Sequence, residues 1–321
     1  RTKFILCVCG MGRSDRQAPQ SNRLFWVWFA IIAVVLVGVV YQPAMTGGFY
    51  FDDGRNIVEV TALHWREFST ENLAALWSET KLPARVVANF SFALNHLVWG
   101  QDPYYFRLVN VIIHLVAGFG LAWMIDTFVR DLSPGTPAFT RRYLSAFAAL
   151  VFLLHPLNIQ AVSYIVQRMT SLAAMFSILS FSTFVVSFMV QGWRRVFQGV
   201  LSLVLALFAI GSKENAYLLP LLFALYAFAR SRSLGYHGYC QSMLRTSLGV
   251  AVFLVFLGGA AIIGISMGLT EYWLVPFPLR DFSGYERVLT QFRVQLRYLA
   301  LWLVPLPDWL NLDHDVQVSR S

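Results

Sequence analysis

The sequence predicts an all-α, polytopic bundle of transmembrane helices. Three observations support this fold class: 57% of the 321 residues are hydrophobic, only 13% are charged, and uncharged runs of membrane length recur along the chain. A soluble domain carries about 25% charged residues. The net charge of +8 does not indicate nucleic-acid binding, because the basic residues are spread over short loops and form no continuous stripe.

Seven uncharged runs are candidate spans, because a membrane-crossing helix needs about 20 predominantly apolar residues. They cover residues 24–51, 108–125, 143–167, 169–193, 196–212, 215–229 and 246–270. A shorter run at residues 298–310 could cross the membrane, re-enter it or lie in its interface. We therefore predict one transmembrane domain over residues 24–321, preceded by a cytoplasmic segment over residues 1–23.

The distribution of Lys and Arg predicts the orientation, since the cytoplasmic loops of membrane proteins are enriched in these residues. Thirteen basic and two acidic residues lie in the segments on the N-terminal side, which are 1–23, 129–142, 191–195 and 230–245. Nine basic and ten acidic residues lie in the opposite segments, which are 42–103, 155–170 and 271–297. The N-terminus is therefore expected in the cytoplasm, and residues 42–103 form a large first external loop.

The first external loop is expected to contain short helices. Residues 63–68 and 69–77 have amphipathic helical patterns, and Ser69 or Thr70 can cap the second helix. Residues 85–100 form a third helix, which is expected to lie along the membrane surface. Helical spacing places four of its side chains on one face, namely Arg85, Asn89, Phe92 and His96.

An acidic pair, Asp52 and Asp53, follows the first span within the aromatic stretch "GGFYFDDGRNIVEV". Acids after a span often cap a helix or stay solvated. Aromatic neighbours would instead hold the pair at headgroup depth, where partial desolvation raises the basicity of a carboxylate. Arg55 could keep one of the two acids ionised. The pair is therefore a candidate general base between a lipid-carried substrate and an external acceptor.

Polar residues also occur at the external ends of later spans. His155 and Pro156 are expected to end one apolar helix, because proline sets a helix boundary. Polar side chains then recur at near-helical spacing, at Gln160, Tyr164, Gln167 and Arg168. An arginine at this depth is either functional, because an unpaired charge in a membrane is costly, or it snorkels to the interface.

Two further groups allow a functional and a structural interpretation. Lys213 is a natural phosphate contact that Glu214 can pair with, although the two also suit a simple charged turn. Arg107, Asn110 and His114 share one face of the second span. One polar residue there would serve helix packing, whereas three on one stripe suggest part of a polar cavity.

These segments together resemble the GT-C superfamily of integral-membrane glycosyltransferases. The resemblance is to its bacterial, tetratricopeptide-repeat-linked branch, which is related to the TMTC-type O-mannosyltransferases of animals. The matching stretches are "FDDGRNIVE", "RVVANFSFALNHLVWGQDPYYFRLVNVIIH", "FLLHPLNIQAVSYIVQRMTSLAAMF", "SKENAYLLPLLFALY" and "LPDWLNLDHDVQVSRS". They cover nearly the whole chain from residue 41 on. Two departures occur, since the family often has His at the position of Arg107 and Pro at that of Val86.

The resemblance implies transfer of a sugar from a polyprenyl phosphate on the external face of the membrane. An acid in the first external loop is the general base in this superfamily, and Asp52 aligns with the residue usually credited. Arg55 matches a basic residue that follows the pair in related enzymes. The expected donor phosphate- and sugar-binding residues are Arg55, Arg85, Asn89, His96, His155, Arg168, Lys213 and Glu214.

The implied partners are a polyprenyl-phosphate-linked sugar, a protein or glycan acceptor and the lipid bilayer, without nucleic acid. The implied location is the bacterial inner membrane, with a periplasmic active site. The sequence contains no evident Gly-rich nucleotide loop or metal-ligand set, so no cofactor is expected, and dependence on a divalent metal is left open. The C-terminal part of the family domain and the repeat domain have no counterpart in this sequence.

Three alternatives stay open at the level of the sequence. A secondary transporter or lipid flippase would also be polytopic, but it should carry inverted repeats and midplane charges. An O-antigen ligase or polymerase shares the lipid donor but has its large external loop late in the chain. An inactive membrane anchor for a downstream repeat domain would tolerate substitution of Asp52 and Asp53.

Overall fold

The computed structural model describes residues 19–233, 284–306, 310 and 316–319. The described part is all-α, and no strand occurs in it, which confirms the predicted class of a helical membrane bundle. The predicted span 246–270 and the segment 1–18 lie outside the described residues.

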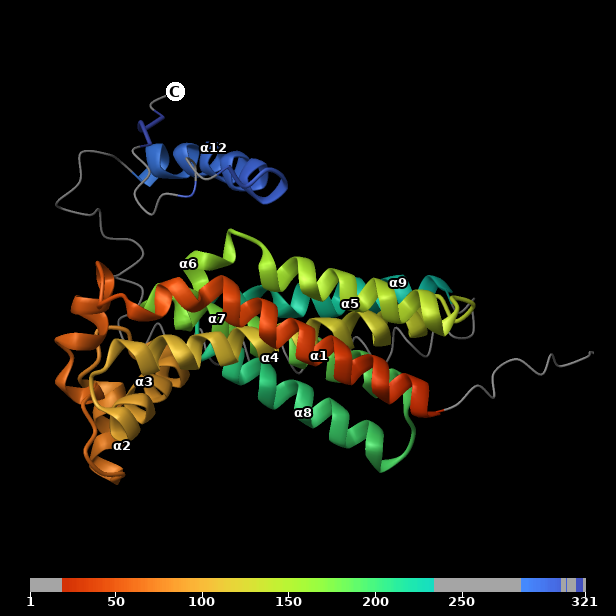
Figure 1. Ribbon diagram of the computed structural model, residues 1–321, viewed down its shortest axis with the longest axis horizontal. Helices are drawn as coiled ribbons and strands as arrows, with labels where there is room; N and C mark the ends of the chain where they lie inside the picture. The colour runs from red at the N-terminus through yellow and green to blue at the C-terminus, as the bar shows by residue number, and fades with distance from the viewer. Residues whose placement is uncertain (1–18, 234–283, 307–309, 311–315, 320–321) are drawn as a thin grey trace, which may run out of the picture.

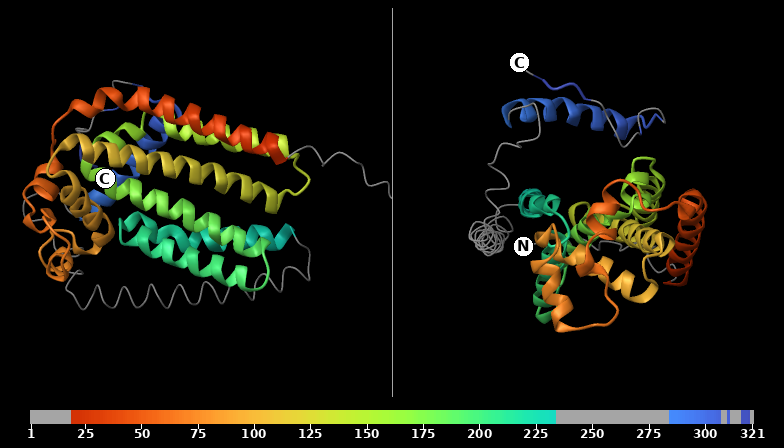
Figure 2. Two further views of the ribbon diagram at one scale, coloured as in Figure 1. Left: turned by 60° about the horizontal axis from the view of Figure 1, so that its bottom comes forward. Right: turned by 90° about the vertical axis from the view of Figure 1, so that its left-hand side faces the viewer.

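Among the described residues, six helices run along the length of the molecule (Figures 1 and 2). They are α1 (Pro19–Tyr41), α4 (Pro103–Leu132), α5 (Ala138–Leu154), α7 (Arg168–Met189), α8 (Trp193–Ile210) and α9 (Leu219–Ser233). Among these, α4 and α7 are central, because α4 packs on α5 and α7, and α7 packs on α8. The apolar sequences of these helices are buried against one another or exposed where a bilayer would cover them, as in a membrane bundle.

Four helical stretches of the described part are long and apolar enough to cross a membrane: Arg23–Thr46, Pro103–Leu132, Ile165–Met189 and Trp193–Ile210. The predicted run 143–167 is not one continuous helix. Helix α5 ends at Leu154, directly before His155 and Pro156, because proline cannot continue the hydrogen-bond ladder. The run 215–229 is also divided, since a short 3-10 helix, η6 (Glu214–Leu218), precedes α9.

Short helices gather at one end of the bundle (left in Figure 1). They are η1 (Gln42–Thr46), η2 (Gly54–Val58), η3 (Thr61–Leu63), α2 (Thr70–Ser78), η4 (Pro83–Arg85), α3 (Val86–Trp99), α6 (Asn158–Ser163) and η5 (Ile165–Gln167). The predicted cap of α2 is confirmed, because the Ser69 hydroxyl accepts the Asn72 amide at 3.1 Å. Helix α3 is also confirmed and ends at Gly100, whose φ of 64° favours glycine.

One prediction about local structure is wrong. Residues 64–68 are irregular and only Leu63 belongs to a helix, because Trp65 turns into the core, where its indole donates to the Ala62 carbonyl at 3.0 Å. Residues 284–297, for which no secondary structure was predicted, belong to helix α12 (Gly284–Leu303). Helix α12 lies beside the bundle on the side of α6 (Figure 1), where His155 Nε2 is 3.0 Å from the Trp302 carbonyl oxygen.

Close packing fixes α4 against α5 near the break after Leu154. A Cβ atom at Gly118 would lie only 2.5 Å from the side chain of Leu153, so a larger residue does not fit without displacement. Small residues at helix interfaces allow such close approach in membranes. The same end contains the main core, in which Phe92, Phe106 and Ile165 are fully buried.

Candidate functional site

The break between α5 and α7 is supported by the polar stripe of α4. Asn110 donates its amide to the carbonyl oxygens of Val162 and Ile165 at 3.1 and 3.3 Å. Arg107 Nε donates to the Ser163 carbonyl at 3.0 Å, and its other nitrogens bind the carbonyls of Gly47 and Gly48. Non-helical backbone at membrane depth needs such partners, because lipid offers none.

His114 completes this stripe, since its Nε2 lies 3.0 Å from the carbonyl oxygen of Leu153, the last residue but one of α5. Arg107, Asn110 and His114 are all buried. They share one face, as the spacing predicts, but their donor atoms meet backbone carbonyls. The stripe is therefore a support for the break in the bundle, which corrects the expectation of an open polar cavity there.

The two acids of the first loop occupy different environments. Asp53 is completely buried and accepts the Tyr50 amide at 3.0 Å and the Val166 amide at 2.7 Å, one on each carboxylate oxygen. Burial raises the pKa of Asp53, while these two amides and the charge of Arg107 oppose the rise. Asp53 thus binds the turn of the first loop to η5.

Asp52 is exposed, and its backbone amide donates to the Tyr164 hydroxyl at 2.8 Å. The preceding residue, Phe51, has a φ of 50°, which is uncommon for a bulky residue. The rings of Tyr50 and Phe51 are stacked 6.1 Å apart and are 62% and 72% exposed. The loop therefore presents the Asp52 carboxylate next to two exposed aromatic rings.

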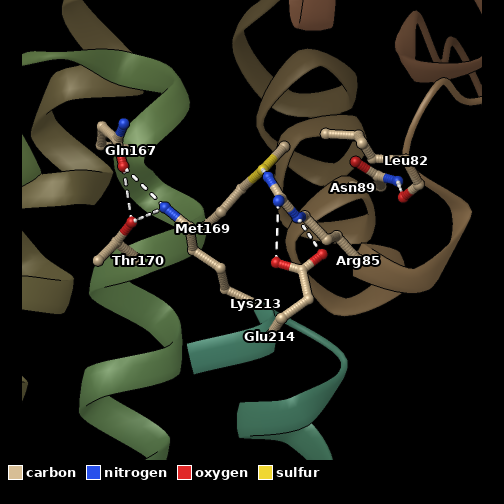
Figure 3. Close-up of polar contacts among 8 residues, drawn as sticks. All are labelled: Leu82, Arg85, Asn89, Gln167, Met169, Thr170, Lys213 and Glu214. Atoms are coloured by element: carbon tan, nitrogen blue, oxygen red, sulfur yellow. Dashed lines mark hydrogen bonds and ion pairs between the residues drawn. The ribbon is translucent and has the colours of Figure 1, made fainter. Parts of the chain in front are cut away.

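A second polar cluster, shown in Figure 3, lies where α3, α7 and η6 meet. Arg85 forms a two-pronged ion pair with Glu214, with N–O distances of 3.0 and 2.9 Å. Lys213 Nζ donates to Thr170 Oγ1 at 2.6 Å and to Gln167 Oε1 at 3.2 Å. We call these five residues, Arg85, Gln167, Thr170, Lys213 and Glu214, the cationic cluster.

A backbone hydrogen bond also positions this cluster. The Val87 amide donates to the Gly211 carbonyl at 2.9 Å, which joins the first turn of α3 to the loop before η6. A Cβ atom at Gly211 would lie 2.8 Å from the Val87 side chain. Only glycine therefore allows this approach without displacement, and the approach brings Arg85 to Glu214.

The cationic cluster has a net charge of about one positive unit, because Glu214 balances only one of the two cations. Burial lowers the pKa of Lys213, the nearby charge of Arg85 lowers it further, and Glu214 partly opposes both. Burial alone would raise the pKa of Glu214, but the hydrogen bonds from Arg85 and the two cations outweigh it and lower that pKa. The described acceptors occupy two of the three ammonium N–H groups, which leaves one donor for an anionic ligand.

One segment, residues 164–170, binds both the acidic pair and the cationic cluster. Tyr164 and Val166 bind the loop at Asp52 and Asp53, whereas Gln167 and Thr170 bind Lys213. The contacts with the loop join residues 112 and 113 positions apart in sequence, and those with Lys213 join residues 46 and 43 positions apart. The break after α5 thus creates the element on which both groups are built.

Arg168 lies in the same segment but faces the interior. It is fully buried and donates to the side-chain oxygens of Asn110 and Asn95 at 2.6 and 2.8 Å. It also donates to the carbonyls of Phe106 at 2.7 Å and Ser91 at 3.1 Å. Its guanidinium is enclosed by protein acceptors and is not accessible to a ligand in this structure. The expected contact of Arg168 with a donor phosphate stays a prediction.

The remaining predicted residues are not gathered at either group. Asn89 is buried and donates to Thr80 and to the Leu82 carbonyl at 3.1 and 3.0 Å. His96 Nδ1 lies 3.1 Å from the Trp65 carbonyl, His155 contacts α12, and the Arg55 side chain is exposed. Of the expected donor-binding set, the structure brings together Arg85, Lys213 and Glu214.

Sequence reasoning did not assign a site role to Tyr164, Gln167 or Thr170. The first two belong to the polar residues that follow His155 at near-helical spacing, so the pattern identified their region. Their roles depend on the short 3-10 turn of η5, which changes the direction in which successive side chains point. A helical projection of the sequence does not contain this turn.

Comparison with known proteins gives one consistent set of relatives. Protein O-mannosyl-transferase TMTC1 of Mus musculus is 30% identical over 191 residues, which are 54% of this chain and 19% of the mouse protein. Human TMTC1 is 28% identical over 192 residues, and human TMTC2 is 23% identical over 308 residues, or 88% of this chain and 35% of TMTC2. The chain is an integral membrane protein similar to TMTC proteins.

The similarity to TMTC proteins confirms the animal side of the expected resemblance, whereas the bacterial branch and the GT-C superfamily stay predictions. No family model matches the chain, and no solved structure matches it. The chain spans only about a fifth to a third of the length of these relatives.

Proposed function

We propose that this chain is the membrane-embedded part of a glycosyltransferase that transfers a sugar from a polyprenyl phosphate to an acceptor hydroxyl, most simply that of a protein. The names of the relatives, protein O-mannosyl-transferases, favour mannose as the sugar. The observation that carries the proposal is that one segment, residues 164–170, contacts both the exposed residue Asp52 and Lys213 of the cationic cluster. A base and an anion-binding group are the two parts that this reaction needs.

In the proposed reaction, Asp52 takes the proton of the acceptor hydroxyl as its oxygen attacks the anomeric carbon. A new carbon–oxygen bond forms there while the bond from that carbon to the phosphate oxygen breaks. The polyprenyl phosphate leaves with the bonding electrons, so negative charge grows on its phosphate. Displacement from the face opposite the leaving group inverts the configuration of the sugar.

Lys213 and Arg85 are the groups that stabilise the leaving phosphate in this mechanism, because fixed cations act most strongly where charge develops. Lys213 has an available donor, and Arg85 adds positive charge that Glu214 orients. No cofactor is assigned to this step, and dependence on a divalent metal is left open. Asp53 supports the base by fixing its loop to Val166.

The location follows from the charge distribution of the sequence. The Lys- and Arg-rich connections support a cytoplasmic N-terminus, which would leave Asp52 and Lys213 on the external face. We propose the bacterial inner membrane, with the lipid donor reaching the site from the external leaflet. The exposed rings of Tyr50 and Phe51 suit this depth, because aromatic side chains favour the membrane interface.

The test is an assay of Asp52→Asn in the full-length protein, with polyprenyl-phosphate mannose as the donor. We expect turnover to fall by about 10²- to 10⁴-fold, the usual contribution of a general base. Asp102→Asn is the matched control, because Asp102 caps α4 through the Tyr104 amide and asparagine caps equally well. Wild-type turnover in Asp52→Asn would exclude Asp52 as the base. A membrane anchor would be favoured if the unsubstituted protein transfers no sugar and folds equally well after substitution of Asp52 and Asp53.

A further inference from the structure

Gln167 carries an unused amide nitrogen at the edge of the cationic cluster. The residue is half-buried and is the last residue of the short helix η5. Its Oε1 lies 3.2 Å from Lys213 Nζ and 2.6 Å from Thr170 Oγ1. Figure 3 shows the three side chains as a closed group, because Lys213 also donates to Thr170 at 2.6 Å.

The chemistry of these two partners decides which way the Gln167 amide faces. An ammonium group only donates hydrogen bonds, so the atom next to Lys213 Nζ must be the amide oxygen. Thr170 accepts from the same ammonium and donates its own hydroxyl proton to that oxygen. Because both contacts need the oxygen, the amide cannot be turned over, and its nitrogen faces away from Lys213.

The Gln167 nitrogen meets no acceptor among the described residues. In that part of the chain, the buried side-chain atoms without a partner are Asn95 Nδ2 and Gln198 Oε1, so Gln167 Nε2 is accessible. An amide nitrogen carries two N–H groups. The structure therefore presents two oriented, neutral donors next to the remaining N–H of Lys213.

The chemistry of the donor indicates what these N–H groups would meet. In a polyprenyl-phosphate sugar whose phosphate is bound by Lys213, that phosphate has two neighbours, the lipid chain and the sugar. The lipid chain contains no hydrogen-bond acceptor, whereas the sugar carries hydroxyl oxygens. The hydroxyl nearest to the phosphate is the 2-hydroxyl, on the carbon next to the anomeric carbon. A neutral amide suits such a group, because a hydroxyl is uncharged and its oxygen accepts hydrogen bonds.

We propose that Gln167 is a specificity-determining residue: its side-chain amide donates to the 2-hydroxyl of the donor sugar while Lys213 binds the phosphate. The assignment rests on the proposed function, because it needs Lys213 to bind the donor phosphate. It adds a means of selecting the sugar. A site that hydrogen-bonds a substrate hydroxyl discriminates against the analogue that lacks it, since the polar group of the protein is then left without its partner.

A glutamine that only held Lys213 and Thr170 in place would behave differently. Its loss would weaken phosphate binding by the same factor for every sugar attached to that phosphate. A contact with the 2-hydroxyl instead affects only donors that carry this hydroxyl. The two roles are therefore separated by comparing two donors in the same set of variants.

The experiment measures kcat/KM of the full-length protein for polyprenyl-phosphate mannose and for its 2-deoxy analogue. Gln167→Met keeps most of the side-chain volume and removes the amide. We expect the preference for the mannose donor to fall by about 2- to 10-fold relative to the wild type, the range of one lost neutral hydrogen bond. The intrinsic reactivities of the two donors cancel, because the same pair is compared in every variant.

Gln101→Met is the matched control, since it makes the same chemical change at an exposed glutamine of the first external loop. The Gln101 amide donates to the Val58 carbonyl at 3.2 Å, so its role there is structural. Gln101→Met should keep the wild-type preference between the two donors.

An unchanged preference in Gln167→Met would overturn the role of Gln167, and an equal loss of kcat/KM with both donors would place its amide at the phosphate or in the fold instead. If Gln167→Met does not fold, Gln167→Ala also removes the amide. An unchanged preference in Gln167→Ala, or failure of this variant to fold as well, would overturn the role too. Asp52→Asn is measured beside these variants: if it is inactive, such results leave the proposed function intact, whereas wild-type transfer by Asp52→Asn would refute the proposed function itself.

Discussion

Two cations meet at residues 164–170, and they differ in their surroundings: Arg168 belongs to this segment, and Lys213 binds Gln167 and Thr170 in it. Arg168 is fully buried, donates four hydrogen bonds to neutral oxygens and lies 4.6 and 5.2 Å from the rings of Phe92 and Phe106. Lys213 is half-buried and binds two neutral oxygens beside the ion pair of Arg85 and Glu214.

The difference teaches that the number of hydrogen-bond donors already occupied by the protein, more than the charge, separates a cation that stabilises a fold from one that can bind a ligand. Every acceptor of Arg168 comes from α3, α4 or the turn between them, so the guanidinium joins these elements to α7. Asn95 even directs its oxygen to Arg168 although its own Nδ2 lacks a partner among the described atoms. Lys213 retains one donor beyond its two bonds to Gln167 and Thr170 among the described residues.

The largest effect is expected from Arg168→Leu, which tests whether Arg168 stabilises the fold. Removal of the guanidinium leaves the oxygens of Asn95 and Asn110 buried without their donor. We expect the free energy of unfolding to fall by about 1–3 kcal/mol for each buried oxygen that is left without its donor. The measurement is the yield of monodisperse protein and its thermal unfolding in detergent. Arg66→Leu is the control, since Arg66 is exposed. A stable but inactive Arg168→Leu would contradict the structural role.

The second largest effect is expected from Lys213→Met, which tests whether Lys213 binds the donor phosphate. Methionine keeps most of the side-chain volume and removes the charge. We expect kcat/KM to fall by about 10²-fold with little change in melting temperature, because the lost donor acts on the leaving phosphate. Lys81→Met is the matched control, because Lys81 is an exposed lysine of the first loop that pairs with Glu59. Loss of folded protein in Lys213→Met would make this centre structural, like that of Arg168.

The smallest effect is a change in pH dependence. Because burial and Arg85 lower the pKa of Lys213, its positive charge is lost at a lower pH than that of an ordinary lysine. The donor KM should therefore rise as the pH increases through this lowered value. Lys213→Arg should move that rise to higher pH, since a guanidinium stays protonated. A donor KM that is independent of pH in the alkaline range would show that the charge of Lys213 does not contribute to donor binding.

Local signals predicted much of the helical framework. Ser69 starts α2, Gly100 ends α3, and His155-Pro156 ends α5, because each of these residues changes the backbone hydrogen bonding of its own neighbourhood. The pattern failed at residues 64–68, where burial of Trp65 outweighs the amphipathic spacing. It also failed at Arg107, Asn110 and His114, whose spacing was correct but whose donor atoms bind backbone carbonyls, among them those of the distant break after α5.

The candidate site was predictable by region and only partly by residue. The sequence identified Asp52, Arg85 and Lys213 from charge next to apolar runs, since such charges are rare in membrane segments. It did not separate Asp52 from Asp53 in burial, and it placed Arg168 with Lys213. Both distinctions depend on contacts between residues that are 58 to 113 positions apart.

The sequence by itself determined that this protein is a helical membrane protein, because apolar length and scarce charge are local properties that the bilayer selects directly. It also determined the break after α5, because Pro156 cannot continue a helix. Only the tertiary structure decided which charges are enclosed and which remain accessible. That decision depends on where the turn at residues 164–170 meets α3, α4 and η6, and no local pattern contains the partners that those elements supply.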